Sequence, residues 1–109
     1  MIKELDFRPG SIVYDDFDID PRISFEQQIF SLKEDLFQVN YNDKYLIDVG
    51  WGPEFDLKGK FKVRIIKSFN WIEPIYFRQT SNLKTLYTLL EECISITRDL
   101  IEKENNAKE

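Results

Sequence analysis

The chain has 109 residues, a net charge of −5, 42% hydrophobic residues and 15% aromatic residues. This apolar content excludes a disordered chain, and the length suits one compact domain over residues 1–109 with a core of its own. No apolar run is long enough to span a bilayer, and acidic residues near the start replace the basic ones that a signal peptide requires. We therefore expect a cytoplasmic protein with no membrane partner.

Residue types needed for several kinds of chemistry are missing. The sequence has no histidine and one cysteine, Cys93, which excludes an internal disulfide, a zinc site built from soft ligands, and Ser-His or Cys-His nucleophile pairs. We expect Cys93 to be a small buried core residue. The acidic total argues against nucleic-acid binding, because Lys and Arg make most phosphate contacts. The composition therefore indicates no catalytic residue, no cofactor and no metal.

The first predicted elements are a short strand and a helix. Residues 11–14 follow the turn signal Pro9-Gly10 and fit a short strand. Ser24 suits an N-cap, with Gln27 three residues later as in a capping box. Apolar residues then recur at helical spacing and predict a helix over about 24–35. These residues are Phe25, Ile29, Leu32 and Leu36.

From residue 37 on, apolar and polar residues alternate, a pattern that is typical of strands. We predict four strands, at residues 37–41, 44–51, 60–67 and 74–80. Asn42-Asp43 predicts a type I′ turn between the first two, because both residues tolerate positive φ. Pro74 predicts an edge position for the last strand, since proline cannot donate to a sheet ladder.

A long amphipathic helix ends the chain. Ser81 or Asn82 caps it, and an apolar stripe at helical spacing continues to about residue 103. Residues 104–109 are polar and lack this periodicity, so we expect a frayed tail. Hairpin-length connections favour an α+β fold: an antiparallel sheet of three to five strands, with an N-terminal helix and a long C-terminal helix packed on it.

Acidic residues are concentrated in the first half of the chain. Residues 1–59 hold 13 acidic and 6 basic residues, a net charge of −7, whereas residues 60–109 hold 7 and 9, a net charge of +2. The densest stretch begins like a calcium loop, but Pro21 and Gln27 stand where an EF-hand needs Gly and Glu. It is interpreted as an exposed acidic turn or a partner-facing patch, formed by Asp15, Asp16, Asp18 and Asp20.

Two further patterns have a functional and an ordinary structural interpretation. Asp48, Glu54 and Asp56 could supply a glycosidase carboxylate pair, but acidic domains contain many such pairs and this short chain leaves little room for a sugar cleft. The basic strand 60–67 could stack a nucleic-acid base on Phe61. Its basic residues alternate with apolar ones, however, as on any half-exposed strand, so we favour the structural interpretation.

Three motifs carry a resemblance to a known group. The stretch YLIDVGWGPEFD at residues 45–56 is followed by GKF at 59–61 and NWIEP at 70–74. Together with the closing helix, these motifs resemble a group of small bacterial immunity proteins, the cytoplasmic antitoxins of contact-dependent growth inhibition and related toxin systems. The resemblance covers about residues 31–101. Gly52 departs from it, since an aromatic residue is expected there.

The resemblance implies a binding protein and not an enzyme. An immunity protein binds the cognate C-terminal toxin domain that a neighbouring cell delivers, often a nuclease with a basic groove, and blocks it. An acidic inhibitor complements such a groove. We therefore hypothesise that the chain, a monomer or a 1:1 heterodimer with the toxin, neutralises it by occlusion. The hypothesis assigns attraction to Asp15, Asp16, Asp18, Asp20, Glu54 and Asp56, and apolar anchoring to Trp51, Phe55 and Trp71.

Two alternatives stay open at this point. The chain could be a regulatory or structural binding module that forms homo-oligomers, which would show as a concentration-dependent mass. It could also be a small hydrolase that uses Asp48, Glu54 and Asp56. Single alanine substitutions at these carboxylates would then abolish turnover and leave the fold intact.

Overall fold

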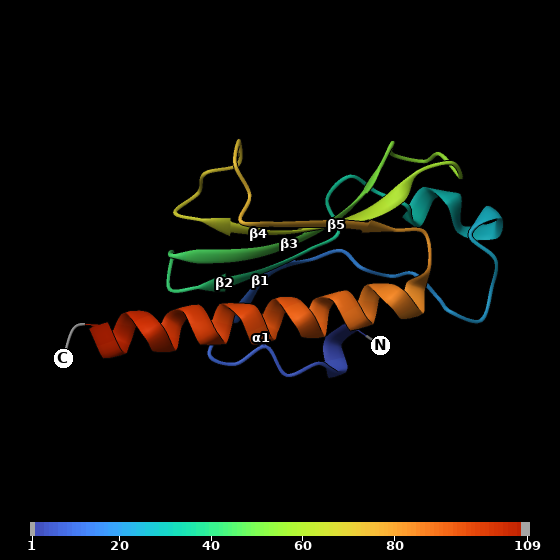
Figure 1. Cartoon of the computed structure of the whole chain (residues 1–109). Helices are drawn as coiled ribbons and strands as arrows, with labels where there is room; N and C mark the ends of the chain where they lie inside the picture. Colours follow the sequence, from blue (N-terminus) through green and yellow to red (C-terminus); the bar gives the residue numbers. More distant parts are fainter. Residues whose placement is uncertain (1, 108–109) are drawn as a thin grey trace.

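The structure is a computed structural model that describes residues 2–107. Five strands form one antiparallel sheet in chain order, with boundaries within two residues of those predicted: β1 (Ser11–Asp15), β2 (Phe37–Tyr41), β3 (Tyr45–Gly52), β4 (Lys60–Lys67) and β5 (Tyr76–Thr80). The helix α1 (Leu83–Ala107) lies across one face of the sheet, and η1 (Ile2–Glu4) and η2 (Glu26–Ser31) are short 3-10 helices (Figure 1). The α+β fold is confirmed. No helix in this described part of the chain has the length and apolar character of a membrane span.

The core lies between the sheet and α1. Alternate residues of β2, β3 and β4 face the helix, and the predicted stripe of α1 packs on them. The amide N–H of Thr85 donates to Oδ1 of Asn82 at 2.9 Å, which confirms Asn82 as the cap. Cys93 is buried, and burial raises the pKa of its thiol to about 12. The buried residues of α1 are Leu86, Leu90, Cys93, Ile94 and Thr97.

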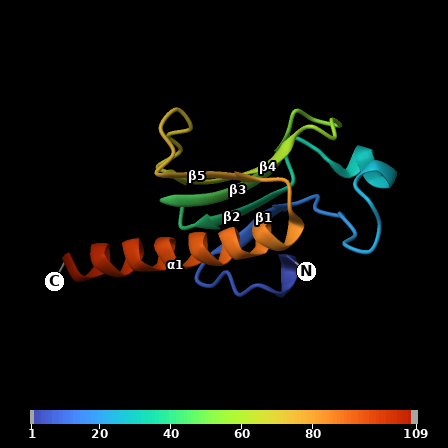
Figure 2. The same cartoon turned by 45° about the vertical axis from the view of Figure 1, so that its right-hand side comes forward.

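Among residues 2–107, no helix lies on the other face of the sheet in either view (Figures 1 and 2). We call it the helix-free face. Strand register aligns five residues across it, one from each strand: Tyr14, Gln38, Asp48, Arg64 and Phe77. This row is polar in the middle and aromatic at both edges.

The turn between β2 and β3 has the predicted geometry. Asn42 and Asp43 adopt φ values of 57° and 59°. The side chain of Asn40 accepts a hydrogen bond from the Asp43 amide at 2.8 Å and donates one to the Asp43 carboxylate at 2.7 Å. A positive φ at two successive residues and this side-chain support are what a type I′ turn requires.

The predicted N-terminal helix over 24–35 is wrong. Only the 3-10 helix η2 forms, and Gln28 inside it has non-helical dihedrals of −128° and 36°. The amide of Leu36 donates to Val49 at 3.0 Å and the carbonyl of Lys33 accepts from Trp51 at 2.8 Å, so the segment that follows η2 bonds to β3. Burial of Leu32 and Leu36 through these extended contacts overrides the helical spacing of the apolar residues.

The C-terminal end also differs from the prediction. Helix α1 continues to Ala107, so residues 104–107 of the expected frayed tail are helical, and residues 108–109 lie outside the described part. Glu104 explains the extension, because its carboxylate accepts from Tyr45 at 2.5 Å and pairs with Lys44 at 2.7 Å. These contacts attach the last turns of the helix to the β2–β3 turn.

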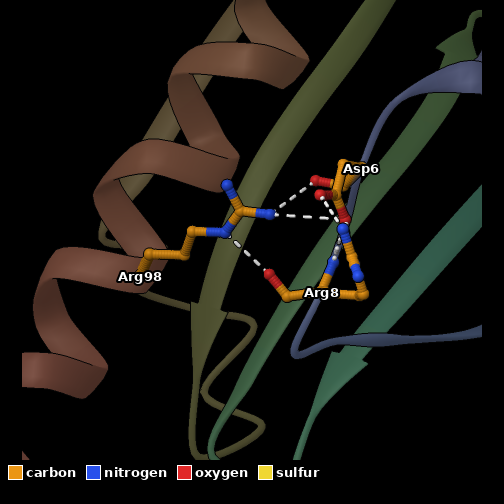
Figure 3. A network of polar contacts seen from close by, with 3 residues as sticks. All are labelled: Asp6, Arg8 and Arg98. Carbon is orange, nitrogen blue, oxygen red and sulfur yellow. Dashed lines mark hydrogen bonds and ion pairs between the residues drawn. The ribbon is translucent and has the colours of Figure 1, made fainter.

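Arg98 attaches the N-terminal segment to α1 (Figure 3). Its guanidinium donates to the backbone carbonyls of Arg8 at 2.7 Å and Asp6 at 2.8 Å. Asp6 in turn receives two side-chain hydrogen bonds from Arg8, and these bonds lower the pKa of the Asp6 carboxyl. The Arg98 guanidinium therefore holds the segment before β1 against α1 by binding its backbone carbonyl oxygens.

The close approach of Gly50 and Glu34 gives a first prediction. A Cβ at Gly50 would collide with the backbone carbonyl oxygen of Glu34, whereas a Cβ at Gly52 would meet only the end of the Lys62 side chain at 2.9 Å. Gly50→Ala should therefore lower the free energy of unfolding by about 2–3 kcal/mol, and the matched control Gly52→Ala by less than about 1 kcal/mol. Urea denaturation measures both. Equal losses in the two variants would contradict this packing.

Candidate functional site

Seven of the nine residues proposed for partner binding lie at one end of the sheet. The segment after β1, the helix η2 and the β3–β4 loop meet there, at the right of Figure 1. We define the acidic end as residues 15–35 and 53–59, which hold nine acidic and three basic residues, a net charge of −6. The acidic end includes seven of the proposed residues: Asp15, Asp16, Asp18, Asp20, Glu54, Phe55 and Asp56.

Backbone and side-chain hydrogen bonds hold the β3–β4 loop against the segment after η2. The amide of Phe55 donates to the carbonyl of Leu32 at 2.8 Å. The indole N–H of Trp51 donates to the carbonyl of Asp56 at 2.8 Å, and the Asp56 carboxylate accepts from the Lys58 amide at 2.8 Å. Asp56 therefore shapes the loop, and its carboxylate is engaged within it.

The segment after β1 is fixed in a similar way. The amide of Asp16 donates to the carbonyl of Leu36 at 2.8 Å, and its carboxylate pairs with Lys33 at 3.0 Å. The side chain of Gln28 accepts from the amide of Asp20 and donates to its carbonyl, both at 2.8 Å. The non-helical backbone of Gln28 thus has a cause, because this residue ties η2 to the acidic segment.

An exposed aromatic pair projects from the acidic end. Phe30 of η2 is 75% exposed and Phe55 is 42% exposed, and their rings meet edge to face at 5.4 Å. Phe55 also adopts a φ of 57°, a left-handed conformation that bulky side chains rarely adopt. Phe30 was not among the residues proposed from the sequence. Its position outside the stripe of apolar residues in 24–36 is the signal that could have identified it.

Trp51 is not a surface anchor, which corrects the prediction. Its side chain is 1% exposed and lies edge to face with Phe25 and Phe61, at 5.6 and 4.9 Å. The β3–β4 loop folds back over the indole, whose N–H donates to the carbonyl of Asp56. Trp51 is a core residue that positions this loop.

Trp71 lies at the opposite end of the sheet from the acidic end. It belongs to the β4–β5 loop, residues 68–75, at the left of Figure 1. Trp71 is 47% exposed, and its neighbours Phe69 and Ile72 are exposed as well. The structure therefore separates the proposed partner-binding residues into two surfaces at the two ends of the strands.

The three carboxylates considered for hydrolysis do not line one hollow. Glu54 lines a hollow of about 290 Å³ together with Lys62 and Arg64, whereas Asp48 and Asp56 are not among its lining residues. Asp48 lies on the helix-free face, where it accepts from Gln38 at 2.9 Å and faces Arg64 at 3.7 Å. Within residues 2–107, no group of three acidic or cysteine side chains is arranged to hold a metal ion.

Comparison of the chain with protein-family models, curated proteins and solved structures gives no match. The most distinctive side chains of the described residues are the exposed aromatic residues at the two ends of the sheet and the acidic residues around one of these groups.

The buried carboxylate of Asp48 gives a pH-dependent prediction. Burial raises its pKa, although Gln38 and Arg64 oppose the shift. The folded protein therefore binds this proton more tightly than the unfolded chain does. As the pH rises above the ordinary pKa of 3.8 and through the higher folded-state pKa, ionisation of Asp48 lowers the free energy of unfolding. Asp48→Asn should be more stable than wild type at pH 7 in urea titrations, with the advantage disappearing below pH 3.8. The exposed control Asp18→Asn should show no such gain, and a less stable Asp48→Asn protein at pH 7 would contradict the argument.

The backbone of Phe55 gives a third prediction about stability. Phe55→Gly relieves about 1–2 kcal/mol of left-handed strain. It also loses about 0.5–1.5 kcal/mol of contact with Phe30 and adds about 0.5–1 kcal/mol of backbone entropy. Urea denaturation should therefore show a net change below about 1 kcal/mol. Phe61→Ala, in the core, should cost about 3–5 kcal/mol. A loss of that size for Phe55→Gly would show that the ring is structural.

Proposed function

We propose that the protein is an immunity protein that acts in the cytoplasm by binding a toxin domain and occluding it. The observation that carries the proposal is the exposed pair Phe30 and Phe55 within an end of net charge −6. Contiguous exposed apolar groups that are rimmed by polar or charged residues are typical of protein interaction sites. The resemblance of residues 45–56 to immunity proteins supports the same function, because this stretch contains Phe55 and the residues that position it.

The mechanism requires no covalent chemistry. The acidic end attracts a basic surface, such as the substrate groove of a nuclease, and raises the rate of encounter. The rings of Phe30 and Phe55 then enter an apolar depression of the partner, surrounded by ion pairs. Because several hydrogen bonds already fix the loop and η2, little conformational entropy is lost on binding.

Co-expression tests the function directly. The probe is the C-terminal domain of the protein encoded by the reading frame immediately upstream. Expression of this domain alone should stop growth, and co-expression with the chain should restore it and yield a 1:1 complex. A toxic domain that the chain neither binds nor neutralises would contradict the proposal.

Charge reversal tests the role of the acidic end. The triple variant Asp18→Lys, Glu26→Lys and Glu54→Lys should slow association with the domain at least tenfold at low salt, with a smaller effect at high salt. Stopped-flow kinetics gives both rates. The matched control reverses three exposed acids of α1, Glu91, Asp99 and Glu102, with the same change in net charge. Equal effects in the two variants would show that only total charge matters.

A homo-oligomeric binding module is the second candidate, and the edge strand β1 favours it. Ile12, Val13 and Tyr14 are all exposed there, and an exposed apolar edge can pair with a strand of another chain. The β-bulge between Ile12 and Tyr14 weakens such pairing. Sedimentation equilibrium of the isolated chain distinguishes the candidates, since a mass that rises with concentration would favour the module.

A further inference from the structure

Two loops rise from the helix-free face, one at each end of the sheet. The β3–β4 loop and the β4–β5 loop both project away from α1, and the two views agree on this arrangement (Figures 1 and 2). The first loop presents Phe55 beside Phe30. The second presents Phe69, Trp71 and Ile72, of which Ile72 is 92% exposed. The helix-free face thus lies between two loops that expose apolar side chains.

Both loops contain a phenylalanine in a left-handed backbone conformation. The φ values are 57° at Phe55 and 58° at Phe69, and Ser68 next to Phe69 has a φ of 51°. Glycine or asparagine would adopt this conformation with less strain, and neither ring is buried in the core. Strained residues that gain no burial are typical of binding sites, where the strain positions a side chain for a partner.

Opposite charges lie side by side on the helix-free face. Strand β4 places Lys60, Lys62 and Arg64 on this face, in the half that adjoins the acidic end, since Lys60 pairs with Gly52 and Lys62 with Gly50. Lys62 and Arg64 line one hollow together with Glu54. A uniformly basic partner surface would be repelled by this basic row of β4. The face fits a partner surface on which an acidic patch lies beside a basic one.

Between the two loops, side-chain contacts fix the polar groups of the helix-free face. Gln38 donates to Asp48 at 2.9 Å, and the Arg64 guanidinium lies over the ring of Phe77 at 4.8 Å. Strand β4 runs from one loop to the other, and its seven residue steps span about 23 Å. A standard protein interface of about 800 Å² per partner is roughly 30 Å across. One globular domain can therefore contact both loops at once.

We propose that the whole helix-free face is one contact surface, on which the toxin domain is held by both loops. The inference rests on the proposed function and specifies its contact surface. The partner domain presents a basic patch with an apolar depression to Phe30 and Phe55 and an adjacent acidic patch to the basic row of β4, and Trp71 and Ile72 anchor its other side at the β4–β5 loop. The acidic end and the basic row of β4 together allow one orientation of the domain and disfavour the reversed one.

The sign of a charge-reversal effect tests this surface. The probe is the purified C-terminal domain from the upstream reading frame, and association is followed by stopped flow at low and high salt. Lys60→Glu with Lys62→Glu should slow association several-fold at low salt, because the basic row of β4 faces acidic residues of the domain. Faster association would mean a uniformly basic partner surface and would overturn the inference. The control Lys84→Glu with Lys103→Glu changes the same net charge on α1, and an equal effect there would also overturn it.

Apolar anchoring at the β4–β5 loop is tested with the same domain. Trp71→Ala and Ile72→Ser should each weaken the equilibrium Kd about tenfold or more, while Val13→Ser, an exposed apolar control on β1, should leave it unchanged. Circular dichroism and urea denaturation verify that the variants are folded. If wild type binds and both loop variants bind equally well, the inference is overturned and the proposed function stands. If wild type itself fails to bind, the proposed function and the inference are both overturned.

Discussion

The burial of Trp51 is the interaction on which the acidic end depends. Its ring packs edge to face with Phe25 and Phe61 in the core, and its indole N–H reaches the carbonyl of Asp56 in the β3–β4 loop. A Cβ at Gly59 would lie 2.5 Å from the indole nitrogen, so this loop can close over the ring only with glycine there. One side chain therefore connects the rigid sheet to the loop that presents Phe55.

The sheet and the long helix could be predicted because their local signals agree with their tertiary contacts. The strands β2 to β4 alternate as their burial requires, Asn42-Asp43 supplies the positive φ values of the turn, and Asn82 caps α1. Local and tertiary preferences conflict in residues 24–36. Helical spacing there is real, but hydrogen bonds to β3 and the side-chain bonds of Gln28 determine the observed backbone.

The sequence could predict most residues of the candidate site, but not how they are arranged in space. Charge density identified the aspartates of the acidic end, and the motif around residue 55 identified Phe55. Trp51 and Trp71 carry the same kind of signal in sequence, yet one is in the core and the other is at the far end of the sheet. Exposure of an aromatic ring depends on which loop folds over it. The sequence could not show this because it depends on how the β3–β4 loop closes, with the carbonyl of Asp56 and the backbone of Gly59 against the Trp51 indole.

Hydrogen exchange of the chain with and without the upstream-encoded domain tests most directly whether the protein works through this surface. We expect added protection of backbone amides in residues 26–34, 53–59 and 68–75, with little change along α1. Protection confined to α1 or to the β1 edge would contradict the account, because the partner would then contact the molecule away from both raised loops.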